Sequence, residues 1–167
     1  IRNDAKDPGA LVMPARDLCL SCHEDVTHQS KVHRPVAESC GNCHNAHNSK
    51  NRYLLHLPTR ALCTGCHTGI EQVINESRDG HEAVFKGNTC RNCHSPHSSN
   101  FENLLIGSPI DVCMMCHGTD AIRDDEGRKL SDVRNILQKN YYLHKPMEKK
   151  DCFVCHAVHG GNYSNLL

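Results

Sequence analysis

The chain has 167 residues, with 19 basic and 19 acidic side chains and no formal net charge at neutral pH. This balance excludes a basic nucleic-acid surface and a polybasic membrane anchor, and no apolar stretch approaches transmembrane length. Only 38% of the residues are hydrophobic, 4% are aromatic and none is Trp. Because such a chain forms a poor core by itself, we expect bound apolar groups to complete it.

Six copies of Cys-x-x-Cys-His run along the chain and use all twelve cysteines. Two thiols three residues apart can join the two vinyl groups on one edge of a porphyrin, and the following histidine can then bind the iron. The sequence therefore predicts six c-type haems. The haem-attaching residues are Cys19, Cys22, Cys40, Cys43, Cys63, Cys66, Cys90, Cys93, Cys113, Cys116, Cys152 and Cys155. The proximal iron ligands are His23, His44, His67, His94, His117 and His156.

Zinc and disulfides are the alternative uses of these cysteines. The spacing of Cys19, Cys22, Cys40 and Cys43 also fits a four-cysteine zinc ribbon. However, zinc does not require a histidine after each pair, and with fourteen histidines in the chain six such coincidences have a chance of roughly one in three million. Disulfides closing six short CxxC loops would stabilise little. The pattern favours haem.

The motifs pair into three repeats. Each repeat contains a CxxCH, a spacer, a histidine before a short apolar stretch, a second CxxCH with another histidine three residues beyond it, and a Leu-Leu pair. We predict one continuous haem-organised domain. Its segments are an N-terminal extension at 1–17 and two-haem repeats at 18–61, 62–111 and 112–167.

The spacers between the paired motifs differ in length, and the longer two predict short helices. Apolar residues share a helix face from 69 to 78, and again from 130 to 141 behind Ser131, a plausible N-cap. Each helix would present a histidine, His81 or His144, just past its C-terminus. The predicted fold is mostly irregular with short α-helices, three two-haem repeats wrapped around a haem stack, and little or no β-sheet.

Histidines left over after the proximal ligands predict the distal side of each haem. Six of the remaining eight recur at matching positions, which implies bis-histidine ligation of every iron. These distal ligands are His33, His47, His81, His97, His144 and His159. Met114 and Met115 lie inside an attachment loop, where packing is their expected role.

Each distal histidine is expected to serve a haem other than the one nearest in sequence. A three-residue tether spans at most about 10 Å, too short for His47 to pass round its own porphyrin. We expect His47, His97 and His159 to cap the first haem of their own repeat, and His33, His81 and His144 to cap the second. His28 and His56 fall outside the pattern; we favour solvent exposure, with distal ligation or ligation in another subunit left open.

The motifs resemble the multihaem c-type cytochromes with a doubled CxxCH motif. Residues 33–36 (HRPV) and 93–97 (CHSPH) match that family's pattern most closely, whereas HEAV at 81–84 and HKPM at 144–147 each depart from it in one position. The resemblance implies a protein of electron transport, not an enzyme, that passes electrons through stacked haems. It also implies periplasmic or extracellular respiratory chains, with other redox proteins or cytochromes as partners.

Several forms of this function stay open from the sequence. A soluble carrier and a subunit of a conductive filament built from copies of the chain are both compatible with it. A multihaem reductase is the alternative class, and it would need one iron without a distal ligand, often with an altered motif such as CxxCK; all six motifs here are CxxCH. Because haem is attached outside the cytoplasm, we expect the chain, which opens at Ile1, to be a mature or trimmed form.

Overall fold

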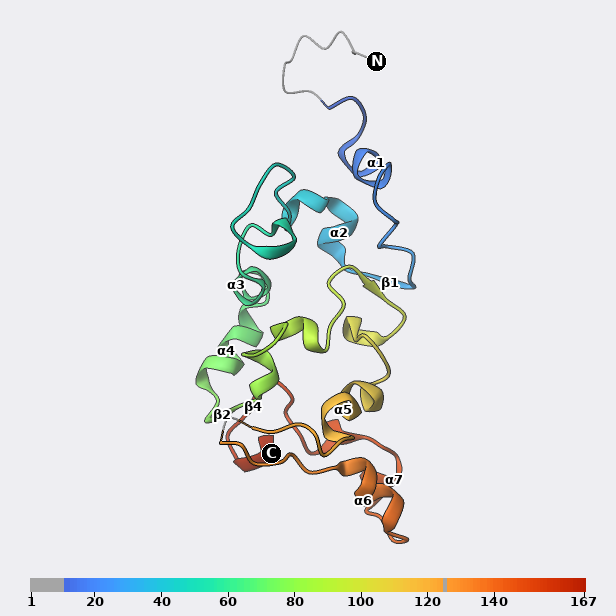
Figure 1. Ribbon diagram of the computed structural model, residues 1–167, viewed down its shortest axis with the longest axis vertical. Coiled ribbons are helices and arrows are strands. Elements are labelled where there is room, and N and C mark those ends of the chain that lie inside the picture. The colour runs from blue at the N-terminus through green and yellow to red at the C-terminus, as the bar shows by residue number, and fades with distance from the viewer. Residues whose placement is uncertain (1–10, 125) are drawn as a thin grey trace.

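The three repeats follow one another along the long axis of the molecule, from the N-terminal end to the C-terminal end (Figure 1). This computed structural model describes residues 11–124 and 126–167. The first ten residues of the predicted extension, 1–17, lie outside the described residues. Most of the described chain is irregular, which confirms the predicted fold class.

Regular secondary structure comes in short pieces. The α-helices are α1 (Ala15–Leu20), α2 (Arg34–Glu38), α3 (Thr59–Thr64), α4 (Thr68–Glu76), α5 (Pro109–His117), α6 (Val133–Lys139) and α7 (Lys145–Glu148). The strands are β1 (Lys31–Val32), β2 (Asp79–Gly80), β3 (Ser98–Ser99) and β4 (Gly160–Gly161). The 3₁₀ turns are η1 (Cys40–Asn42), η2 (Arg52–Leu54), η3 (Glu82–Val84), η4 (Thr89–Asn92), η5 (Glu102–Leu104), η6 (Cys152–Val154) and η7 (Ser164–Leu166).

The two motifs of a repeat begin on different local structures. The first lies on an α-helix, α1, α3 or α5, and a proline stands at the start of each helix. Proline fits there because its fixed φ suits a helix start and its missing N–H would be unpaired in any case. The second motif begins on a 3₁₀ turn, η1, η4 or η6.

The two helices predicted in the spacers are present with shifted ends. The helix expected at 69–78 is α4, and the one expected at 130–141 is the shorter α6. The N-cap of α6 is Asp132, whose carboxylate accepts a 3.0 Å hydrogen bond from the Asn135 N–H, so the prediction of Ser131 was wrong. His81 and His144 each follow their helix by five residues, as N-caps of η3 and α7.

A left-handed turn ends each repeat at its Leu-Leu pair. The residue before the pair has a φ of 60° at Tyr53, 53° at Asn103 and 63° at Asn165. The first leucine is also left-handed, and its carbonyl accepts a hydrogen bond from the residue after the second proximal histidine, at 2.7–2.8 Å in all three repeats. The turn thus folds the end of each repeat back onto its second motif.

Two small antiparallel ladders join consecutive repeats. Strand β1 pairs with β3, so that Val32 lies opposite Ser98. Strand β2 pairs with β4, so that Gly80 lies opposite Gly160. In both ladders the residue just before a spacer histidine of one repeat meets the residue just after the CxxCHxxH histidine of the next.

Very little of the described chain is buried by its own side chains. Leu55, Ile74, Val84 and Met114 are the only buried hydrophobic residues within 11–124 and 126–167. The chain exposes 12462 Å², against about 8,300 Å² for a compact protein of this mass. The side chains alone therefore bury less surface than those of a compact protein of this mass.

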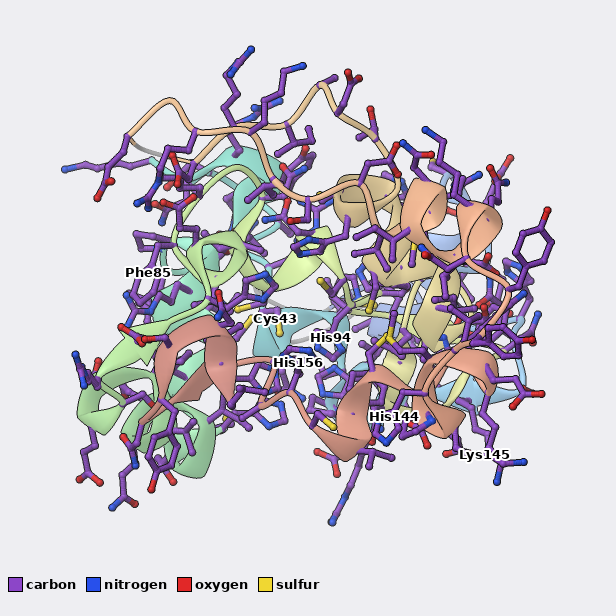
Figure 2. The ribbon with its side chains drawn as sticks, turned by 90° about the horizontal axis from the view of Figure 1, so that it is seen from below. Cys43, Phe85, His94, His144, Lys145 and His156 are labelled. Carbon is purple, nitrogen blue, oxygen red and sulfur yellow. The ribbon has the colours of Figure 1, made fainter. Side chains whose placement is uncertain are left out.

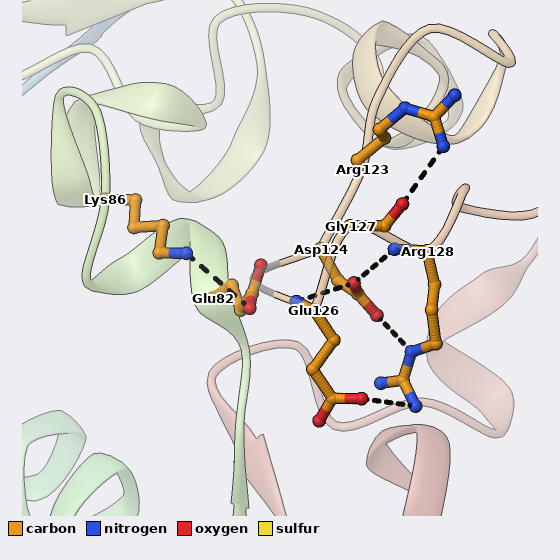
Figure 3. A network of polar contacts seen from close by, with 7 residues as sticks. All are labelled: Glu82, Lys86, Arg123, Asp124, Glu126, Gly127 and Arg128. Atoms are coloured by element: carbon orange, nitrogen blue, oxygen red, sulfur yellow. Dashed lines mark hydrogen bonds and ion pairs between the residues drawn. The ribbon is translucent and has the colours of Figure 1, made fainter.

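The long spacer of the third repeat forms a hairpin of its own (Figure 3). Asp124 accepts hydrogen bonds from the backbone N–H and the guanidinium of Arg128, at 2.8 and 2.7 Å. The guanidinium is the largest cause of a lowered pKa of Asp124. The Leu130 N–H donates to the Ile122 carbonyl and brings the two ends of the hairpin together. Across the described residues, no helix combines the length and apolarity that a membrane crossing requires.

Candidate haem-binding sites

The twelve cysteines are free thiols, and their contacts connect the motifs in chain order. Within a repeat the first cysteines of the two motifs are hydrogen-bonded; between repeats the second cysteine of one repeat influences the pKa of thiols in the next. The interacting pairs are Cys19 with Cys40, Cys43 with Cys66, Cys63 with Cys90, Cys93 with Cys116, and Cys113 with Cys152. These interactions therefore join the six motifs in one row, from the first motif to the sixth.

Thiol acidity differs along the row. Burial is the largest cause of a raised pKa at Cys19 and Cys43, and it raises the pKa of Cys113 to about 11. A hydrogen bond between Cys63 and Cys90 raises the pKa of Cys63 and lowers that of Cys90 to about 6.

Eight histidine rings face one another in four pairs. The ring centres are 6.0 Å apart for His33 and His67, 6.0 Å for His44 and His97, 6.3 Å for His81 and His117, and 6.1 Å for His94 and His159. Each pair joins a predicted proximal ligand to a predicted distal ligand, and the ring planes are inclined by 15–33°.

The ring spacing fits one iron between two imidazoles. A metal–imidazole bond of about 2 Å and roughly 1.1 Å from the nitrogen to the ring centre, taken twice, give about 6.2 Å. Burial, followed by the facing ring, lowers the pKa of His97, His117 and His159. A lowered pKa favours the neutral imidazole, which is the form that binds metal. The residues present therefore fit haem with two axial histidines.

The second predicted proximal histidine of each repeat is oriented by a backbone carbonyl. His44 and His94 bind the carbonyls of Tyr53 and Asn103 through Nδ1, at 2.7 and 2.8 Å. His156 makes the same contact with Asn165, at 2.9 Å. These acceptors are the left-handed residues before the Leu-Leu pairs, and a bonded Nδ1 leaves Nε2 as the nitrogen available for iron.

On the distal side, His33 and His81 bind carbonyls of the next repeat. Their Nδ1 atoms contact the carbonyl oxygens of Pro96 at 3.0 Å and Val158 at 2.9 Å. Each of these carbonyls belongs to the residue before a CxxCHxxH histidine. These carbonyl partners could not be predicted from the sequence, because a backbone acceptor does not depend on residue type; only the recurring Leu-Leu pair indicated the turn.

The pairing expected within each repeat is wrong for all four observed pairs. His33 faces the first proximal histidine of the second repeat, and His97 of the second repeat faces the second proximal histidine of the first. The second and third repeats exchange rings in the same way. The ladders explain this arrangement, because they hold each spacer histidine beside the following repeat.

The remaining histidines form two groups. His28 and His56 are exposed and bind the carbonyls of Asp25 and Gly41, at 2.6 and 2.8 Å. The second group consists of predicted iron ligands that face no other ring in the described part of the chain. Its members are His23, His47, His144 and His156.

The zinc alternative finds no support in the described residues. No three His, Cys, Asp or Glu side chains within 11–124 and 126–167 converge as a bare metal ion would require, and this includes Cys19, Cys22, Cys40 and Cys43. Viewed along the long axis, Cys43, His94 and His156 lie near the middle of the molecule, whereas Lys145 points outward (Figure 2). His144, also labelled in Figure 2, lies away from this middle, on the side of Lys145.

Comparison with known proteins identifies the family of this chain. The family model for the doubled CXXCH motif matches residues 33–72, 81–122 and 144–167. This chain belongs to the doubled CXXCH motif family. The chain is also 29% identical over 147 residues to the multiheme cytochrome MtrA of Shewanella baltica (strain OS185), a match that covers 86% of the chain. The match covers 32% of that relative, so the chain spans about a third of its length. The doubled CXXCH motif family is one of multihaem c-type cytochromes, which transfer electrons through covalently bound haems.

Proposed function

We propose that this protein transfers electrons along six c-type haems in a row and catalyses no reaction of its own. The observation that carries the proposal is the order of the thiol contacts. Thiols are hydrogen-bonded within each repeat, and between repeats Cys43 and Cys93 act electrostatically on thiols of the following motif; none of these interactions skips a motif among the described thiols. The attachment points therefore follow one another in chain order, and the two cysteines of each motif would hold one haem by thioether bonds.

When bound, the haems supply irons that each accept and release one electron. The four ring pairs would close both axial positions of their irons, which excludes substrates. Two imidazoles also keep the potential below that of a site with one histidine and one methionine. The carbonyls of Tyr53, Asn103, Pro96 and Val158 fix the ring orientations and make the imidazoles more basic.

We infer that the protein works outside the cytoplasm, in periplasmic or extracellular respiratory electron transport, because c-type haem is attached there. Its partners would be other redox proteins or cytochromes, and the likeness to a multiheme cytochrome supports a partner of the same kind. A reductase with an open iron is the second candidate. The observation that favours it is that the exposed His23 and His156 face no other ring within the described residues.

The test is voltammetry of the holoprotein held on gold by one end. Thioether bonds would use all native cysteines, so Lys139→Cys on α6 would give a single free thiol. We expect six one-electron centres at fast scan rates. Removing the fourth haem with Cys90→Ala and Cys93→Ala should slow electron exchange with the first three haems, but not with the fifth and sixth.

The control is the tethered protein with His28→Ala, which should match its parent. Equal exchange by all remaining haems with and without the fourth would contradict a row. Fewer than six haems per chain, measured independently as pyridine haemochrome, would contradict the haem count. Turnover of nitrite or hydroxylamine by the wild-type protein would favour the reductase.

A further inference from the structure

The two junctions inside the chain use one set of contacts. At each junction, the spacer histidine of one repeat faces the first proximal histidine of the next, as His33 faces His67. In return, the CxxCHxxH histidine of the next repeat faces the second proximal histidine of the first, as His97 faces His44. A two-residue ladder lies beside each exchange. The junction is therefore reciprocal, with two rings exchanged in opposite directions.

A third junction of the same kind, between the third repeat and a first repeat, would pair all four predicted ligands that face no other ring. The third repeat presents a spacer histidine, His144, and a second proximal histidine, His156. The first repeat presents a first proximal histidine, His23, and a CxxCHxxH histidine, His47. All four are exposed, whereas seven of the eight paired rings are half-buried. The two ends of the molecule thus carry complementary halves of one more junction.

The backbone repeats the same complementarity. Tyr142 and Leu143 precede His144 as β1 precedes His33, and they pair with no strand in the described chain. Tyr142 and its neighbour Tyr141 are each 98% exposed. At the other end, Asn48 and Ser49 follow His47 as β3 follows His97. The Ser49 hydroxyl binds the Leu55 carbonyl as the Ser99 hydroxyl binds that of Leu105, so the segment already has the local form of β3.

We propose that a second copy of this chain completes the two ends. In the head-to-tail joint, His144 of one copy lies opposite His23 of the next, and His47 of that next copy lies opposite His156 of the first. Residues 142–143 and 48–49 form the ladder beside them. This inference rests on the proposed haem ligation. Each copy is added to the next in the same orientation, and the internal junctions extend along one axis (Figure 1). The head-to-tail joint therefore builds an open filament.

The proposal fixes the share of irons that lack a distal ligand. A single copy has two such irons of six, and an assembly of n copies still has two in all, so the share falls as 1/(3n). Ferric EPR should find about one third of the iron high-spin in single copies, about one sixth in dimers, and almost none in long assemblies. Light scattering and negative-stain microscopy measure n on the same samples.

The decisive variant is His47→Ala with His144→Ala in the full 167-residue holoprotein. Both side chains are exposed, so the substitutions leave the fold intact. We expect single copies at every concentration, with about one third of the iron high-spin. Added imidazole should restore the low-spin signal without restoring assembly. The matched control, His28→Ala with His56→Ala, removes two exposed histidines outside the pattern and should assemble as the wild type does.

Two results would overturn the proposal: wild-type protein that stays as single copies at high concentration, or a His47/His144 variant that assembles as well as the wild type. Wild-type single copies with all six irons low-spin would also overturn it, because the open ligands would then be satisfied within the chain. Haem content and full reduction by dithionite are measured in parallel. A low haem content or incomplete reduction would contradict the proposed electron-transfer function, and not the proposed joint between copies.

Discussion

Removing the ring of His33 tests whether the facing rings are axial ligands. His33 faces His67 with ring centres 6.0 Å apart, and its Nδ1 lies 3.0 Å from the Pro96 carbonyl. His28, five residues earlier, also binds a carbonyl through Nδ1, that of Asp25 at 2.6 Å, but faces no ring. Alanine at either position thus removes one hydrogen bond, worth about 1 kcal/mol, and only at position 33 removes a ring pair.

His33→Ala should therefore add one high-spin ferric iron in six, counted by EPR against total haem. His28→Ala should add none, and both variants should lose a similar amount of unfolding free energy. Added imidazole should return the His33→Ala spectrum to that of the wild type. If the two variants have the same high-spin count, the ring pairs are not iron sites, and the ligand assignment drawn from their spacing is wrong.

Three further substitutions test the supports of the sites. Asn103→Val puts a β-branched residue at φ 53°; it should cost about 1–2 kcal/mol in thermal unfolding, whereas Asn103→Gly should be neutral within a few tenths. Gly160→Ala would place a Cβ 2.7 Å from the Ser77 hydroxyl; it should cost about 1–3 kcal/mol in denaturant unfolding, and Ser77→Gly in the same chain should recover most of it. Asp132→Ala should lower the opening free energy of α6 by about 1 kcal/mol, because the helix loses its N-cap, and hydrogen exchange in α6 should become faster. Ser131→Ala should leave the exchange rate unchanged. Equal effects at 131 and 132 would contradict the observed cap.

The sequence predicted chemistry better than it predicted partners. The CxxCH motifs are local, so spacing alone predicted the cofactor class, which the family match supports, and the attachment residues and proximal histidines, which stay predictions. The recurrence of His33, His81 and His144 marked them as a set, but nothing in the spacing revealed which ring each would face. That information lies in ladders between residues 66 or more positions apart, such as Val32 with Ser98. Two-residue strands have no periodicity to detect, and the glycines of β2 and β4 disfavour strand on propensity.

The left-handed turns could not be predicted from the sequence either, although some of their residues favour a positive φ. Asn103 and Asn165 suit a positive φ, whereas Tyr53 and the leucines that follow all three do not. The strain of these residues is offset because the turn makes two hydrogen bonds. The carbonyl before the first leucine binds the second proximal histidine, and the carbonyl of that leucine accepts the N–H of the residue after the histidine. The Leu-Leu pair recurs because it lies on this turn.

The pairing of histidine rings across repeats explains why the spacer lengths differ. From first proximal histidine to spacer histidine the chain runs 10, 14 and 27 residues in the three repeats. A ligand for a haem within the same repeat would have to be positioned by that spacer, and its length would be constrained. Here the two residues just before His33 and His81 fix the ring by pairing with the next repeat. The spacer only has to connect the first motif to the spacer histidine. In the third repeat, the hydrogen bond from the Leu130 N–H to the Ile122 carbonyl holds the extra residues in a separate hairpin. The element that stays the same is therefore the junction, so a repeat can carry a longer spacer without any change in the ring pairs on either side of it.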